Sequence, residues 1–165
     1  MIWAVDVWLL YKSSESGVDP LTLASQAFLT SLESDGGIAL SPEVFSAYSS
    51  AVDKLGTKFG AKWFAAMSKL VGRVQRIDEP EDRGCAELRE ALADYHPPFS
   101  LHDDDVCYAV LAHRSPDRHL ISGDVGNGDF APDCTSWLHV HWSICFHDLA
   151  TEDPYHSARH ACLTG

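Results

Sequence analysis

The sequence predicts an α/β fold, a three-layer α/β/α sandwich around a central, mostly parallel β-sheet. Three observations support this prediction. Short apolar runs alternate with longer segments in which apolar residues recur at helical spacing. The connections between these segments are short, as in chains whose parallel strands are joined by helices. Two of the apolar runs end directly at an aspartate, and in such sheets ligands gather at the carboxyl ends of the strands.

Length and composition indicate a single soluble globular domain. The chain has 165 residues, of which 45% are hydrophobic, and 12 basic against 24 acidic side chains leave a formal charge of -12. Disorder is excluded, and no apolar run approaches the ~18 residues of a membrane span. The acidic balance argues against non-specific binding to phosphate backbones, which needs clustered Lys and Arg. An odd set of five cysteines without a CxxC pair, and an N-terminus without signal-peptide features, predict a reduced cytoplasmic location.

The first half of the chain is expected to follow the order βαβα. The apolar run 2–5 predicts a strand. Asp6 ends this run, and the apolar residues 7–10 are expected to continue the strand. A helix over 20–35 follows, capped by Asp19 and opened by a proline. A second short strand at 38–40 precedes a helix through about residue 55, whose cap is Ser41.

The second half is expected to contain three helices, an extended segment and two strands. Helical spacing predicts helices over 59–71, over 81–93 and from residue 103 to about 112, with a short extended segment at 74–77. A buried strand is expected at 119–122. Strict alternation from 138 to 146 predicts a further strand, the clearest one in the sequence. The remainder, 148–165, is expected to be a loosely held tail or a short terminal helix.

Asp6 and Asp124 each follow a predicted strand, and Asp105 opens the helix before the second of these strands. All three carboxylates are therefore expected to converge on one edge of the sheet. Such a cluster requires a cation, and hard oxygen ligands select Mg²⁺ or Mn²⁺. A site of this kind suits metal-assisted hydrolysis of a phosphodiester. The alternative, that each aspartate caps a helix or lines a turn, is the better explanation of any one of them but not of the set.

Four segments of the chain resemble the PIN domain, a small α/β ribonuclease fold, over about residues 1–130. They are the strand ending in Asp6, IALSPEVFSAY at 38–48, DDDVCYAVLA at 103–112 and HLISGD at 119–124. The resemblance implies that Asp6, Asp105 and Asp124 bind the metal and are catalytic. It also implies that Ser122 and Asp104 support the site and that Asp129 is a further acidic ligand.

The resemblance further implies a Mg²⁺- or Mn²⁺-dependent endoribonuclease, of the kind found as the toxin of a toxin–antitoxin pair. RNA is then the substrate, an antitoxin or another protein is the natural partner, and homodimers are frequent in the family. The PIN-like domain is expected to span residues 1–147, with the tail at 148–165.

Two positions depart from the PIN pattern. The glutamate of the second segment falls on Ala47, and the Thr or Ser that often follows the first aspartate is Val7. Glu43, one helical turn earlier on the same face, is expected to replace the missing ligand. The alternative is a degenerate PIN-like module with weak or no catalysis that acts in protein or RNA binding.

The histidines offer a third hypothesis, a zinc protein. On a strand at 138–146, His139 and His141 would share one face about 7 Å apart, and His156 and His160 would chelate if the tail were helical. The alternative is that these histidines form the polar face of an edge strand. Cys107 and Cys145 are expected to be small core residues rather than nucleophiles. The five tryptophans are expected to pack in the core rather than to stack on bases.

Overall fold

The computed structural model describes residues 1–78, 81–94, 101–123 and 130–150. Its centre is a five-stranded sheet in the order β3-β2-β1-β4-β5, and every neighbouring pair of strands is parallel. The strands are β1 (Ile2–Val5), β2 (Gly37–Leu40), β3 (Val74–Arg76), β4 (His119–Ser122) and β5 (Cys145–Asp148). The predicted α/β fold is confirmed, and the sheet is parallel throughout the described strands.

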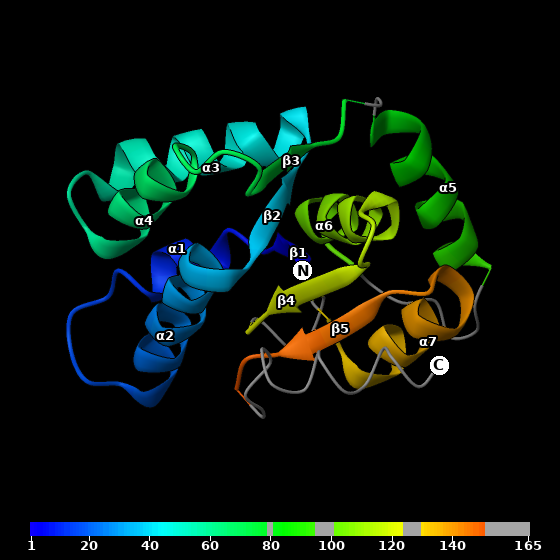
Figure 1. Ribbon diagram of the computed structural model, residues 1–165. Coiled ribbons are helices and arrows are strands. Elements are labelled where there is room, and N and C mark those ends of the chain that lie inside the picture. The colour runs from blue at the N-terminus through cyan, green and yellow to red at the C-terminus, as the bar shows by residue number, and fades with distance from the viewer. Residues whose placement is uncertain (79–80, 95–100, 124–129, 151–165) are drawn as a thin grey trace.

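Helices flank the sheet (Figure 1). They are α1 (Trp8–Lys12), α2 (Pro20–Asp35), α3 (Pro42–Leu55), α4 (Phe59–Met67), α5 (Glu81–Ala93), α6 (Asp103–Arg114) and α7 (Pro132–Trp142). Helix α6 packs on β1, β2 and β4, whereas α3 and α4 lie side by side near β2 and β3. None of the helices in the described part of the chain is long and apolar enough to cross a membrane.

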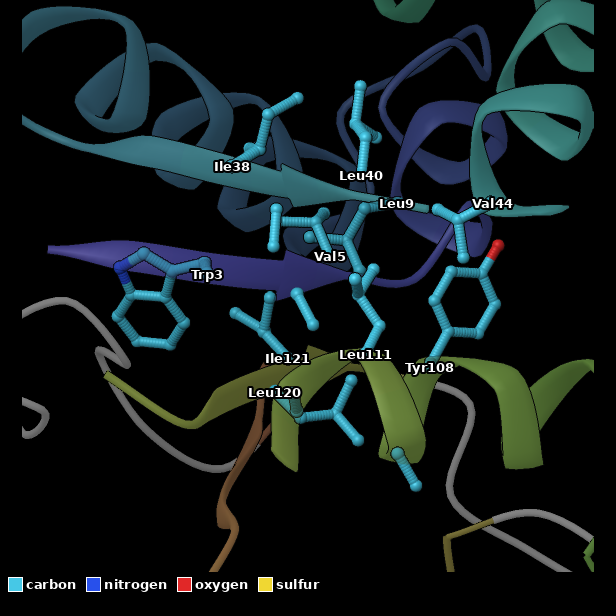
Figure 2. Close-up of a cluster of buried hydrophobic side chains, with 14 of the residues drawn as sticks. Trp3, Val5, Leu9, Ile38, Leu40, Val44, Tyr108, Leu111, Leu120 and Ile121 are labelled. Carbon is cyan, nitrogen blue, oxygen red and sulfur yellow. The ribbon is translucent and has the colours of Figure 1, made fainter. Parts of the chain in front are cut away.

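The central strand β1 is buried on both faces, since Trp3, Ala4 and Val5 are completely inaccessible to solvent. Figure 2 shows the side chains of Val5 and Leu40 lying between the sheet and the surrounding helices, with Leu111 of α6 close by. Parallel strands covered by helices in this way have continuous apolar sequences, as the runs at 2–5 and 37–40 do.

The predicted starts of α2 and α3 are confirmed by their capping bonds. A carboxylate oxygen of Asp19 accepts a hydrogen bond from the amide of Thr22 at 3.1 Å, and the Ser41 hydroxyl accepts one from Val44 at 3.2 Å. Each helix begins with proline, whose missing N–H is not needed there. Helix α3 therefore starts directly at the carboxyl end of β2.

Two predicted elements have different bounds. Residues 7–10 do not continue the first strand, because the chain turns into α1 after Asp6 and the amide of Trp8 binds the Asp6 carboxylate. The helix expected over 59–71 ends at Met67, and a turn with positive φ at Gly72 then leads into β3.

The strand predicted over 138–146 is wrong. Residues 132–142 form α7, which begins at Pro132 and buries Cys134 and Leu138, one turn apart, whereas Val140 is 71% exposed. Ser143 then adopts the left-handed conformation with a φ of 54°, and β5 follows. The alternation of apolar residues does not mark a buried face here, because the burial follows the helical spacing of positions 134 and 138.

The cysteines differ in state. Cys85, Cys107 and Cys134 carry thiol groups, the Sγ atoms of Cys85 and Cys107 lie 3.7 Å apart, and burial raises the pKa of Cys134 to about 11. Cys145, which the sequence predicts as a small core residue, is half-buried and disulfide-bonded.

Candidate active site

Asp6 lies immediately after β1 and is 4% exposed. One carboxylate oxygen, Oδ1, accepts the amide hydrogen of Trp8 at 2.9 Å, and the other, Oδ2, accepts the hydroxyl hydrogen of Ser122 at 2.6 Å. The backbone amide of Asp6 donates to the carbonyl oxygen of Ile121 at 3.1 Å. Asp6 is therefore fixed between the start of α1 and the end of β4, as the adjacent parallel strands require.

The first turn of α6 carries two further candidate site residues, Asp104 and Asp105. Asp105 is 7% exposed, and Asp104 is exposed. The partial positive charge at the amino end of a helix stabilises carboxylates at these positions. Asp103 pairs instead with Arg89 of α5, at 2.9 Å between the guanidinium and Oδ1.

Tyr108, one turn further along α6, is buried. Its hydroxyl oxygen accepts the amide hydrogen of Val7 at 3.2 Å. Burial raises the pKa of Tyr108 most, and the charges of Asp6, Asp104 and Asp105 raise it further. All three carboxylates thus act on one phenol, which stays protonated. Figure 2 shows the hydroxyl of Tyr108 pointing away from α6 toward Val44.

A second tyrosine, Tyr48 of α3, supports the same region. Its hydroxyl donates to the carbonyl oxygen of Val5 at 2.6 Å, and its pKa is raised well above 10, first by burial and then by Tyr108 and Asp6. Neither tyrosine is predicted from the sequence as part of the site. For Tyr108 the signal is its position three residues after Asp105, on the same helical face.

A pocket of about 70 Å³ opens beside Tyr108. Its lining residues are Val7, Glu43, Val44, Ala47, Asp104, Cys107 and Tyr108. Glu43 and Ala47 therefore both face the pocket, as expected for positions one helical turn apart. The pocket wall is acidic at Glu43 and Asp104 and apolar at Ala47.

Asp124 and Asp129 lie outside the described residues. Within the ranges that the structure describes, no three His, Cys, Asp or Glu side chains are grouped closely enough to hold a metal ion. The backbone that leads to Asp124 is nevertheless fixed, because a Cβ on Gly123 would come within 2.5 Å of the Trp8 indole. Trp8 thus packs directly against the chain between Ser122 and Asp124.

The predicted HxH zinc pair is wrong in its geometry. His139 and His141 lie on α7, where residues two positions apart point to different sides of the helix. The ring of His141 instead packs on Trp137, with centroids 4.9 Å apart. His156 and His160 lie outside the described residues.

A buried histidine pair was not predicted. Nδ1 of His119 lies 3.0 Å from Nε2 of His147, and both rings pack against Trp3. Both residues are 3% exposed. His119 lies at the start of β4, three residues before Ser122, and His147 lies on the neighbouring β5 in register with Ile121.

Comparison with known proteins supports the architecture. No protein-family model and no curated protein matches the sequence. A solved structure that does match is the crystal structure of VapBC2 from Rickettsia felis bound to a DNA fragment from their promoter. The match has a TM-score of 0.54 and 14% sequence identity, and it covers 90% of this chain and 98% of the other. This chain has a PIN-like fold. At 14% sequence identity, this match shows a similarity of fold alone.

Proposed function

We propose that the protein is a metal-dependent endoribonuclease of PIN type. The observation that supports this most is that Asp6, directly after β1, and Asp105, in the first turn of α6, are both buried at the carboxyl edge of a parallel sheet, and that the charges of Asp6, Asp104 and Asp105 all raise the pKa of Tyr108. Asp6 and Asp105 come from separate elements, and both are nearly inaccessible to solvent. Burial disfavours the charged form of a carboxylate, and a bound cation would offset that cost.

The donor atoms suit a hard divalent cation such as Mg²⁺ or Mn²⁺, which prefers carboxylate oxygens. Asp6, Asp105 and Asp124 would hold it, with Glu43 and Asp129 as further acidic ligands. A bound ion of this kind makes a water molecule more acidic and therefore a better nucleophile at neutral pH.

The chain's own residues prepare the site. Ser122 donates to Oδ2 of Asp6 and so orients that carboxylate, while the Trp8 amide occupies Oδ1. Tyr108 stays protonated and accepts a hydrogen bond from the Val7 amide, and it lies beside these residues. Asp104 lines the open pocket, where it would meet a phosphate only through a cation, since two anions repel.

Cleavage of a labelled RNA in the presence of Mn²⁺ tests this proposal. Asp6→Asn and Asp124→Asn are each expected to abolish cleavage, whereas Asp53→Asn, on the exposed end of α3, should leave the rate unchanged. Circular dichroism of each variant separates loss of chemistry from loss of fold. Cleavage that survives both active-site substitutions would contradict the metal-site assignment.

A second function, a degenerate PIN-like module that binds protein or RNA without cleaving it, is favoured by one observation. Ala47 lines the pocket where a carboxylate is expected, and it brings no ligand. Titration of Mn²⁺ by calorimetry distinguishes the two functions. The wild type should bind the ion if it is a nuclease, and Ala47→Glu should bind it more tightly. If the wild type gives no heat and Ala47→Glu does, the module is degenerate.

The VapBC2 likeness also suggests a partner. We propose an antitoxin or other protein chain as the natural ligand, homodimer formation, and a cytoplasmic location where RNA is available. Size-exclusion chromatography with light scattering tests the dimer, and co-purification from the native host tests the partner. A monomer that co-purifies with no second chain would remove this part of the proposal.

A further inference from the structure

The positive charge of this acidic chain is concentrated in one stretch. Residues 54–76 contain six of the 12 basic side chains and no acidic one, which leaves six basic against 24 acidic side chains elsewhere. The stretch runs from the end of α3 through α4 to β3, the strand at one edge of the sheet (Figure 1). Such a charge asymmetry indicates a local site for a polyanion.

Most of these cations are available to a ligand. The exposed members are Lys54, Lys58, Lys62, Lys69 and Arg76. In the described part of the chain, none of these five takes part in an ion pair. The sixth, Arg73, is occupied, because its guanidinium donates to the carbonyl oxygens of Gly36 and Ser34 at 2.7 and 3.2 Å. Lys62 lies on α4, and Lys58 is the cap residue at the start of that helix.

A pocket of about 210 Å³ lies where this stretch reaches the carboxyl edge of the sheet. It is lined by Leu40, Ser41, Pro42, Phe45, Arg76 and Asp78. Phe45 is 46% exposed, and its ring centroid lies 6.3 Å from that of Phe64 in α4. The pocket therefore combines the accessible ring of Phe45 with the unpaired guanidinium of Arg76. It lies next to α4, the helix that carries Lys62.

We propose that this pocket binds one nucleotide of a single-stranded RNA, with the base on Phe45 and a phosphate on Arg76. Stacking on aromatic side chains and contacts from basic ones are the two interactions by which proteins bind single strands. The volume is below the ~300 Å³ of sites for drug-sized ligands and suits a single base. Asp78 accepts hydrogen bonds from the amino groups of a base, while the exposed lysines in and around α4 attract the backbone that continues past the pocket.

This inference rests on the proposed nuclease function, and the sheet order links the two sites. β3 is two strands away from β1, and neighbouring strands are about 4.8 Å apart, so Arg76 and Asp6 are offset by about 10 Å across the sheet. A stacked strand rises about 3.4 Å per nucleotide. A nucleotide in the pocket is thus about three positions from a phosphodiester at Asp6. An acidic peptide would use Arg76 but would leave the Phe45 ring without a stacking partner.

The test measures binding of a fluorescein-labelled single-stranded RNA of 12 nucleotides by anisotropy, with EDTA present so that no metal-dependent step contributes. Phe45→Leu keeps an apolar side chain against Phe64 but removes the ring face, and it should weaken binding about tenfold. Arg76→Gln should weaken binding and lower the slope of log K against log salt by about 0.7, the value for one phosphate contact on a single strand. The matched controls, Arg83→Gln in a surface ion pair and Tyr11→Leu on α1, should bind as the wild type does.

Equal affinity of Phe45→Leu, Arg76→Gln and the wild type would overturn the nucleotide pocket. So would competition by poly-glutamate as strong as that by unlabelled RNA, since it would indicate a protein ligand. The two proposals fail separately. Weakened binding without any Mn²⁺-dependent cleavage would retain the pocket and reject the nuclease. Unchanged binding with cleavage lost in Asp6→Asn would do the reverse.

Discussion

The residues at the two ends of β4 have hydrogen-bond partners of different charge. At the carboxyl end, Ser122 donates to a carboxylate, whereas at the start His119 meets another histidine, His147. Burial and, to a smaller extent, the neighbouring His119 together lower the pKa of His147 to about 4. Burial also lowers the pKa of His119, which Asp117 partly opposes.

The buried histidine pair makes the free energy of unfolding depend on pH. A histidine in the unfolded chain has a pKa near 6.5, so between pH 6.5 and 4 the unfolded state binds the proton that His147 in the folded state does not. Stability is therefore complete above pH 6.5 and falls as the pH drops toward 4. At pH 4.5 the loss from His147 is about 2–3 kcal/mol.

Urea unfolding at pH 7 and pH 4.5 measures this loss. His147→Phe, which keeps a ring against Trp3, should lose less stability between the two pH values than the wild type, and His113→Gln, which changes a half-buried histidine elsewhere, should lose as much. The carboxylates are the same in each variant and in the wild type. Their contribution to the loss of stability therefore cancels when the losses of a variant and the wild type are compared. An identical pH dependence in His147→Phe and the wild type would contradict the assignment.

Among the elements, α4 approaches α1 so closely that the contact requires glycine. A Cβ at Gly60 would meet the backbone of Leu10, including its carbonyl oxygen, and the Gly60 amide donates to the Ser14 hydroxyl at 2.8 Å. Backbone cannot move aside as a side chain can. The position therefore determines how closely the two helices pack.

Gly60→Ala is expected to lower the free energy of unfolding by about 1–3 kcal/mol, the usual effect of overpacking. Gly84→Ala in α5 is the matched control, since its Cβ would meet side-chain atoms of Arg114 and Val110 and a helical alanine gains conformational stability. The control should lose clearly less. Chemical denaturation followed by tryptophan fluorescence measures both, and equal losses would refute the backbone-contact explanation.

The elements also differ in how well the sequence predicts them. Caps and prolines predict α2 and α3 correctly, because the capping bonds are local and involve residues close in the chain. The helix α7 is predicted as a strand because burial, and not the pattern of residue types, decides which face is internal. Leu138 is buried but Val140 is not, and that depends on what packs against α7.

The candidate site is likewise predictable from the sequence only in part. Asp6 follows an apolar run, and that local signal places it at the sheet edge. Its bond to the Trp8 amide was not expected, because residues 7–10 read as a strand when their neighbours in space are unknown. Tyr48 and Tyr108 were missed for the same reason, since their hydroxyl partners, Val5 and Val7, lie far away in the sequence.

At the scale of the whole molecule, protection should decrease from the centre of the sheet outward. β1 lies between β2 and β4 and is buried over Trp3, Ala4 and Val5, whereas β3 is an edge strand whose residues are half-buried or exposed. Local opening is cheapest where few apolar contacts are lost.

Amide hydrogen exchange should therefore be slowest in residues 3–5 and faster in residues 74–76. Mass spectrometry or NMR measures the two rates in one sample, which makes each strand the internal control of the other. Protection of β3 equal to that of β1 would mean that the sheet opens only as a unit.

The position of β1 also has a consequence for how the protein is made. Asp6, at the end of β1, and Ser122, at the end of β4, are 116 positions apart in the sequence. At about 5–20 residues per second on the ribosome, β4 emerges roughly 6–23 s after β1. During that interval one side of β1 has no neighbour to pair with. A nascent chain of this topology needs shielding by a chaperone, or it risks pairing with another copy.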